Sequence, residues 1–201
     1  MKVSEFQQRV VNQTRAAYEG EAMTSKQLDT NLTAPATLPP VADPNALLAD
    51  LKQAKFAAPT DEDMQTLAVL RSSSDPWKSR GETQAESLEA LTKLRPFIHV
   101  GKVNGSLLGY VTIERDGPVP GAAYLRNIVV KGELRSKGVG GVLLDKGLSV
   151  ARDLNRKTLA LRVDPANSNA VSFYRKNGFT TVATVVSKKS GKLRLLMSRE
   201  L

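Results

Sequence analysis

Glycines and basic residues gather in one short stretch of the chain, where a predicted strand gives way to a predicted helix. The stretch consists of Arg135, Ser136, Lys137, Gly138, Val139, Gly140 and Gly141. The first N–H groups of a helix have no partner inside the helix, so anions bind there. Glycine lets a phosphate approach the backbone without meeting a Cβ, and Lys131, Arg135 and Lys137 add positive potential. These residue types predict a phosphate-binding loop.

The elements around this loop predict a mixed α/β domain. Hydrophobic patterns predict a strand over 122–130, a helix over 138–154 and a strand over 158–163. This βαβ unit requires its two strands to be parallel. The other predicted strands cover 52–57, 97–103, 106–114, 179–187 and 192–198, with tight turns at Asn104-Gly105 and Ser190-Gly191. The other predicted helices begin at Thr60 and cover 82–94 and 167–176.

A second pattern lies downstream of the loop. It comprises Asn167, Ala170, Phe173, Tyr174, Lys176, Gly178 and Phe179. It resembles the GNAT acetyltransferase pattern Asn-x-x-Ala-x-x-Leu/Phe-Tyr-x-Lys-x-Gly-Phe, and Arg135, Gly138 and Gly140 match the family's loop pattern Arg/Gln-x-x-Gly-x-Gly/Ala in register. The resemblance covers residues 51–200. A dinucleotide-binding fold and a P-loop are excluded, because no ribose-binding acid follows a Gly-rich turn at a first strand and no Gly-Lys-Ser/Thr occurs.

The resemblance implies the GNAT acyl-CoA N-acyltransferase fold, with acetyl-CoA as co-substrate in a gap between two parallel strands that part from each other. Backbone groups of Ile128, Val129 and Val130 would pair with the pantetheine arm, and the amides of residues 135–141 would hold the pyrophosphate. Asn167 would orient the cofactor or the adjacent strand, although it also suits a helix cap. A primary amine of a small molecule, peptide or protein would attack the thioester directly.

Two residues are candidates for proton transfer in that reaction. Tyr174 matches the family's usual general acid, because a phenol with a pKa of about 10 is protonated at neutral pH and can protonate the leaving thiolate. The alternative is that Tyr174 only packs its helix onto the sheet. Glu114 is the carboxylate candidate for the general base and could act through water, since its strand borders the acceptor cleft in the family. His99 has a suitable intrinsic pKa, but a lone histidine on an alternating strand is expected to have a structural role. Glu133 belongs to the loop pattern and is also expected to have a structural position there.

The net charge of +9 is unevenly distributed. It favours an anionic ligand, which could be a polyphosphate cofactor, nucleic acid or an acidic protein surface, and the alternative is a solvated basic surface. Residues 1–58 have as many acidic as basic residues, and residues 59–125 have seven basic and nine acidic residues. Residues 126–201 have sixteen basic and five acidic residues, which suits the phosphates of CoA. Nucleic acid ranks last as a partner, because no recognition motif accompanies the charge and aromatic residues make up only 5% of the chain.

Composition excludes several other kinds of site. The chain has no cysteine, which removes thiolate nucleophiles and disulfides, and one histidine, which removes a histidine metal cluster, so we expect no metal. Neither a signal peptide nor an apolar stretch of membrane-spanning length is visible, so we expect a cytoplasmic protein without a membrane partner. The family takes its acceptor-binding residues from variable segments, here near 72–80 and 115–121, where Trp77 either lines the cleft or anchors the core.

Residues 1–50 are predicted to form an N-terminal arm ahead of an acyltransferase domain at 51–201. A helix is predicted from Ser4 to Ala17, a Pro-rich linker from Glu21 to Pro44, and a short helix from Asp43 to Leu48. The arm leaves an alternative open. A GNAT-like module without enzymatic activity could dock through this arm onto a protein partner in a larger assembly, for example a phage virion, and would then reside in that particle.

Overall fold

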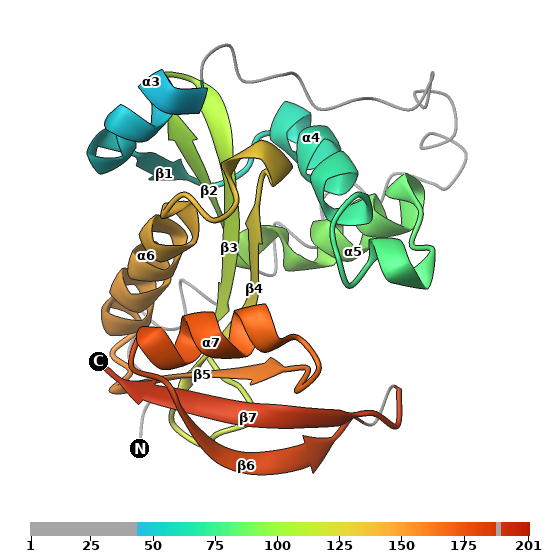
Figure 1. The fold of residues 1–201 in the computed structure, drawn as a ribbon, viewed down its shortest axis with the longest axis vertical. Helices are drawn as coiled ribbons and strands as arrows, with labels where there is room; N and C mark the ends of the chain where they lie inside the picture. The colour runs from blue at the N-terminus through green and yellow to red at the C-terminus, as the bar shows by residue number, and fades with distance from the viewer. Residues whose placement is uncertain (1–43, 188–189) are drawn as a thin grey trace, which may run out of the picture. The chain divides into compact units, whose positions relative to one another are not determined.

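The computed structural model describes residues 44–187 and 190–201, which fall in one of the chain's two units. Its centre is a seven-stranded sheet with the strand order β1-β2-β3-β4-β5-β7-β6 (Figure 1). The strands are β1 (Lys55–Ala57), β2 (Ile98–Val103), β3 (Ser106–Glu114), β4 (Ala123–Val130), β5 (Thr158–Val163), β6 (Thr180–Val186) and β7 (Leu193–Glu200). Of the neighbouring pairs, β4–β5 is parallel and the others are antiparallel. The predicted α/β class is confirmed.

Helices lie on both sides of this sheet. They are α3 (Pro44–Ala49), α4 (Asp61–Ser72), α5 (Gln84–Leu94), α6 (Val139–Asp153) and α7 (Ser168–Lys176). Single 3-10 turns occupy 51–53, 78–80, 95–97 and 132–134. Among the residues described, no helix has the length and apolar character needed to cross a membrane.

Local sequence signals explain where the helices on one side begin. The Thr60 hydroxyl accepts a hydrogen bond from the Asp63 N–H at 3.1 Å, and the Asp63 carboxylate accepts one from the Thr60 N–H at 3.1 Å. Thr83 and Glu86 form the same reciprocal pair at the start of α5. Each pair satisfies two N–H groups that the helix itself leaves without a partner. The predicted start of α4 at Thr60 is therefore confirmed.

The parallel strands β4 and β5 stay together over three register pairs, Ala123↔Leu159 to Leu125↔Leu161. Beyond these pairs β4 continues only along β3, and β5 continues along β7. A bulge accompanies the separation, because Ile113 pairs with Leu125 whereas Thr112 pairs with Asn127. The extra residue, Arg126, bends β4, as bulges generally bend the strand that carries them. The gap between parallel strands that the family resemblance implied is thus present.

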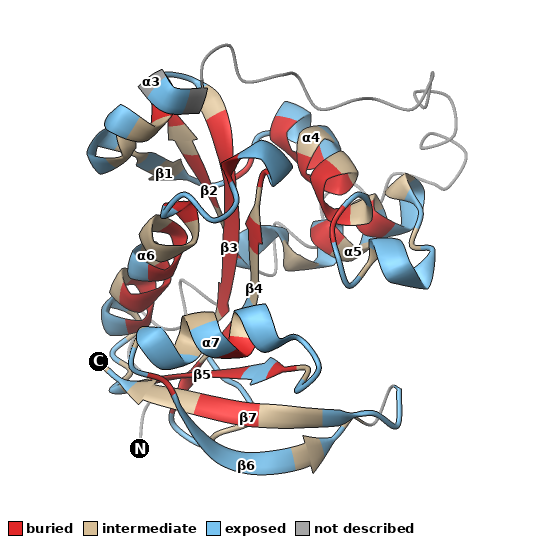
Figure 2. Cartoon of the chain, viewed as in Figure 1, coloured by how far each residue is buried: buried red, intermediate tan, exposed pale blue. Residues whose placement is uncertain are grey.

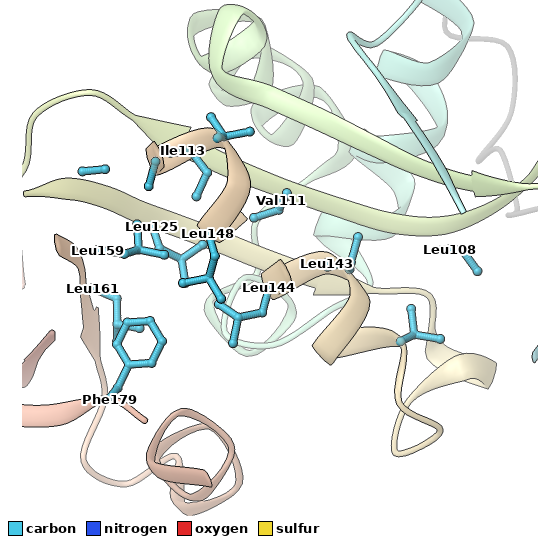
Figure 3. Packing of buried hydrophobic residues seen from close by; sticks show 14 of the residues in the cluster. Leu108, Val111, Ile113, Leu125, Leu143, Leu144, Leu148, Leu159, Leu161 and Phe179 are labelled. Atoms are coloured by element: carbon cyan, nitrogen blue, oxygen red, sulfur yellow. The ribbon is translucent and has the colours of Figure 1, made fainter. Parts of the chain in front are cut away.

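The sheet separates two buried clusters (Figure 2). On one side α6 packs Leu143, Leu144 and Leu148 against leucine, isoleucine and valine side chains of β3, β4 and β5, with Phe179 beside them (Figure 3). On the other side α4 and α5 cover Tyr110 of β3 and Val129 of β4. The two faces of β3 and β4 therefore have different environments, and consecutive residues of one strand enter different ones.

The start of the described chain differs in detail from the sequence-based expectation. Residues 51–53 form a 3-10 turn, so the predicted strand over 52–57 shortens to β1 at Lys55–Ala57. The short helix predicted from Asp43 is present as α3, and its Leu47 is 6% exposed within the cluster under α6. The predicted helix from Ser4 to Ala17 lies outside the described residues, as does most of the linker. The domain boundary near residue 50 stays a prediction.

Candidate functional site

The Gly-rich loop connects β4 to α6 and presents a row of unused backbone donors. Gly138 occupies the position before the first residue of α6 with φ +88, and Ser136 also has a positive φ of 60. Within the described chain, the N–H groups of residues 136–140 donate to no acceptor, whereas the Gly141 N–H donates to the Gly138 carbonyl at 2.9 Å. Five consecutive unused donors at the positive end of a helix can bind an anion.

Hydrogen bonds on both sides of these donors hold the loop in place. The Lys131 N–H donates to the Leu108 carbonyl at 2.9 Å, and the buried Leu134 donates to the Lys131 carbonyl at 2.9 Å. The Lys131 ammonium is itself buried and pairs with Glu133 at 3.2 Å. Lys131 therefore does not add the free positive charge expected from the sequence. Glu133 has the structural position that was expected of it.

The two other basic side chains of the loop have different environments. The Arg135 guanidinium donates to the Ser74 hydroxyl at 2.8 Å, and its Nε lies 3.4 Å from the Val130 carbonyl. Arg135 thus joins the loop to the segment that follows α4. Lys137 is exposed, and none of the described residues forms an ion pair with it. Its ammonium is available to an anion at the start of α6.

The structure brings the two sequence motifs together. A Cβ added to Gly140 would lie 3.4 Å from Cε2 of Phe173 and 4.0 Å from a methyl group of Val130. The start of α6, the end of β4 and the middle of α7 therefore meet at one place. Asn167 caps α7, because its Oδ1 accepts the Ala170 N–H at 3.0 Å. The role of Asn167 as a helix cap is observed, and its predicted contact with the cofactor stays a prediction.

Ile128, Val129 and Val130 form the part of β4 that β5 no longer accompanies. Val129 is buried under α4 and α5, whereas Ile128 and Val130 pack partly against the cluster under α6. All three pair with β3 along one edge of the strand. Along the other edge, on the side toward which β5 would continue, no strand of the described chain pairs with residues 128–130, so this edge can pair with an extended ligand.

Tyr174 lies in α7 between two aromatic rings. Its ring makes edge-to-face contacts with Phe173 at 5.3 Å and with Phe179 at 5.6 Å between centroids. Burial raises the pKa of Tyr174, and the nearby Tyr124 of β4 raises it further. The phenol therefore remains protonated well above neutral pH, as a proton donor requires. Packing and proton donation are compatible in this position.

Glu114 and His99 lie on opposite faces of the sheet. Both carboxylate oxygens of Glu114 accept hydrogen bonds from Arg126, one of them from Nη2 at 2.9 Å. This pairing raises the pKa of Arg126, with burial acting against it. His99 faces α6, and burial lowers its pKa with help from the charge of Lys146. His99 is thus separated by the sheet from the face that carries Glu114.

Several polar groups near the strand separation could not be found from the sequence. Tyr124 lies beside the pair of Glu114 and Arg126, with the Arg126 guanidinium 5.4 Å from its ring centroid. Among the described residues, Thr112 Oγ1 and Asn127 Nδ2 are buried without a hydrogen-bond partner. Thr112 and Asn127 are opposite each other in the β3–β4 register, and no spacing within one strand reveals that register.

Trp77 packs against the cluster under α4 and α5, with Arg71 4.3 Å above its ring.

Known proteins resemble this chain in sequence and in fold. The model of the Acetyltransferase (GNAT) family matches residues 64–179, more than half of the chain. A mycothiol acetyltransferase from Propionibacterium freudenreichii is 33% identical over 91 residues, which are 44% of this chain and 28% of that protein. The aligned part is thus less than a third of that relative.

Solved structures extend the likeness to most of the described domain. Ard1 from Thermoplasma volcanium superimposes with a TM-score of 0.60 and 25% identity, covering 74% of this chain and 97% of that one. The paia N-acetyltransferase of Thermoplasma acidophilum, solved in complex with coenzyme A, gives a TM-score of 0.56 at 18% identity and covers 74% and 99% of the two chains. The region matched to the family contains both motifs that meet at the start of α6, and the chain belongs to the acetyltransferase (GNAT) family.

Proposed function

We propose that this chain transfers the acetyl group of acetyl-CoA to a primary amine. The observation that carries the proposal is the row of unused N–H groups at residues 136–140, at the start of α6 and beside the separated end of β4. The pyrophosphate of CoA supplies the anion that this row of donors suits, and the Lys137 ammonium favours it further. The free edge of β4 at residues 128–130 is suited to pair with the pantetheine amides.

The transfer itself needs no nucleophilic residue of the protein. The neutral amine nitrogen attacks the thioester carbonyl, the new C–N bond forms, the C–S bond breaks, and CoA leaves as a thiolate. The nitrogen of an ammonium acceptor loses two protons in all, one before it attacks and one as the C–N bond forms. The thiolate sulfur takes up one proton, so one proton is released overall. We assign protonation of the sulfur to Tyr174, because its raised pKa keeps the phenol protonated until charge develops on sulfur.

We assign removal of the acceptor proton to Glu114, whose carboxylate already accepts hydrogen bonds from Arg126. Because Arg126 occupies both carboxylate oxygens, Glu114 has to accept the proton through a water or to release one of these hydrogen bonds. We expect Glu114→Gln to lower kcat at neutral pH and to leave the affinity for acetyl-CoA unchanged. An unchanged kcat would remove Glu114 from the mechanism.

Acetyl-CoA binding is the direct test, measured by isothermal titration calorimetry and by thermal unfolding of the full chain. At a free concentration of 100 times Kd, binding stabilises the folded state by about 2.7 kcal/mol. Gly138→Glu is expected to abolish this gain, because it adds a negative charge among the unused donors. Gly121→Glu is the matched control, since Gly121 also has a positive φ of 78 and nothing within 4 Å of an added Cβ. Equal binding by both variants would contradict the proposed site.

Catalysis is tested separately from binding. The released thiol is measured with a thiol reagent, to which a chain without cysteine contributes no background. Acetyl-CoA binding without transfer to any amine would favour the alternative of a non-enzymatic module that docks through residues 1–50. That alternative concerns mainly residues outside the described part of the chain, and it stays a prediction.

A further inference from the structure

Arg162 lies on β5 immediately after the last residue that pairs with β4. Its neighbours Leu161 and Val163 are buried in the cluster under α6, whereas Arg162 is exposed on the opposite face. Tyr124 of β4 alternates in the same way with Ala123 and Leu125 and faces the same side. Arg162 and Tyr124 therefore border, on one face of the sheet, the place where the two strands part.

The charges around this place do not balance. Three other arginines of the domain have a carboxylate partner: Arg126 pairs with Glu114, Arg156 with Asp116, and Arg194 with Asp164. The side chain of Arg162 forms no salt bridge or hydrogen bond with any described residue, although its backbone pairs with β7. Burial raises the pKa of Tyr124, and the positive charges of Arg126 and Arg162 partly oppose this rise. Both guanidinium groups therefore act on the same phenol. Within the described part of the chain, one positive charge at the strand separation thus has no carboxylate partner.

A second observation also indicates a ligand on this face. The Asn127 side chain lies on β4 beyond the bulge, on the same face as Tyr124, and its Nδ2 is buried without an acceptor. Buried donors of folded proteins are almost always paired, with a ligand or a water where the protein offers no acceptor. The Thr112 hydroxyl opposite Asn127 is also without a partner and can donate or accept a hydrogen bond. The guanidinium and the amide N–H are donors and call for oxygen acceptors.

We propose that Arg162 binds an anionic oxygen group of the acceptor, so that the acceptor is an amine that also carries a carboxylate or a phosphate. This inference rests on the proposed acetyl transfer and narrows its substrate class. Arg162 is suited to the role because a guanidinium presents several N–H donors that match the oxygens of either group. An acceptor without negative charge would leave the guanidinium unpaired.

Matched pairs of amines test the inference. We would measure kcat/KM for 5-aminopentanoate against n-pentylamine, and for 3-aminopropyl phosphate against 3-aminopropanol, with acetyl-CoA saturating. The first pair tests a carboxylate and the second a phosphate. We expect the anionic member of at least one pair to be preferred by about tenfold or more, as one charge-assisted contact provides.

Variants assign the preference to one residue. Arg162→Gln is expected to remove the preference by raising KM for the anionic amine, with the neutral amine unaffected. Arg162→Glu is expected to favour 1,5-diaminopentane instead. Arg152→Gln is the matched control, because Arg152 is an exposed arginine in the last turn of α6. It should retain the preference of the unmodified chain.

Three results would overturn the inference. The first is transfer without preference for either anionic amine, and the second is an equal loss for neutral and anionic amines in Arg162→Gln. The third is a loss of acetyl-CoA affinity in that variant, which would place the guanidinium on the cofactor. If acetyl-CoA binds but no amine is acetylated, calorimetry measures the binding of 5-aminopentanoate and 3-aminopropyl phosphate to the CoA-saturated chain. Binding that is lost in Arg162→Gln supports the inference, and no binding to the unmodified chain refutes it. Failure to bind acetyl-CoA at all would instead refute the proposed function.

Discussion

Gly141→Glu should stabilise the unliganded protein and weaken its binding of acetyl-CoA. Gly141 is the third residue of α6, its backbone does not have a positive φ, and an added Cβ would meet nothing within 4 Å. Replacing a helical glycine with a residue that has a side chain contributes about 0.5–1 kcal/mol. An acid in the first turn adds about 0.3–1 kcal/mol through the helix dipole, and α6 has no acid there.

The cost to the ligand is larger than this gain. A carboxylate about 4 Å from one phosphate charge repels it by about 4 kcal/mol at an effective dielectric constant of 20, and each 1.4 kcal/mol is a tenfold change in Kd. We therefore expect at least a 100-fold weaker affinity for acetyl-CoA. For a domain of this size, 1 kcal/mol of added stability corresponds to a rise in Tm of about 2–4 °C without ligand.

Differential scanning calorimetry with and without acetyl-CoA measures both effects on the same samples. Gly141→Gln is the matched control, because it keeps the side-chain length and the helix propensity and omits the charge. It should lose less affinity than Gly141→Glu. If Gly141→Glu bound acetyl-CoA as tightly as the unmodified chain, the pyrophosphate would not lie at the start of α6, and the assignment of the loop would be refuted.

Three further predictions concern catalysis, acid stability and the extent of the domain. Tyr174→Phe should bind acetyl-CoA normally and turn over at least about 100-fold more slowly; full activity would exclude Tyr174 as the acid. Burial opposes ionisation of Glu82, but the hydrogen bonds from Arg71 and Ser87 and the charge of Arg71 together outweigh burial and lower the pKa of Glu82 below the usual 4.5. The pair therefore stabilises the fold above pH 4.5, and this stabilisation is lost as the pH falls through the lowered pKa. Urea titrations at pH 7 should show that Glu82→Gln lowers the free energy of unfolding by about 3 kcal/mol. The difference from the unmodified chain should shrink in acid. Deleting residues 1–43 should leave acetyl-CoA binding intact. Deleting residues 1–50 also removes the buried Leu47 and should lower the free energy of unfolding by about 2 kcal/mol more. Loss of acetyl-CoA binding when only residues 1–43 are deleted would contradict the assignment of those residues to a separate arm.

Local signals made much of the fold predictable. The hairpin around Asn104-Gly105, the cap at Thr60 and the helix after the Gly-rich loop each depend on residues adjacent in the chain, and each is present. The strand predicted over 52–57 was too long, because Lys52 and Gln53 belong to a 3-10 turn at 51–53 and only Lys55–Ala57 pair with β2. Pairing with another strand, which decides where a strand begins, is not visible in so short a stretch of sequence.

The functional site divides in the same way. Its phosphate-binding part could be inferred from the sequence, because backbone N–H groups at a helix start do not depend on distant side chains, and the glycines that expose them lie within seven residues. The surroundings of Glu114 could not be inferred from the sequence. Arg126 lies beside Glu114 only because of the β3–β4 register and the bulge.

The sequence by itself determined the chain's family, its order of helices and strands, and the loop suited to an anionic cofactor. Tertiary structure alone decided that Phe173 lies against Gly140, that Arg135 reaches Ser74, and that the Arg162 side chain, where β4 and β5 separate, has no ion-pair partner among the described residues. The physical reason is that strand register and helix packing arise from many weak contacts spread over the whole core. A one-residue shift in register would move every side chain of a strand to the opposite face.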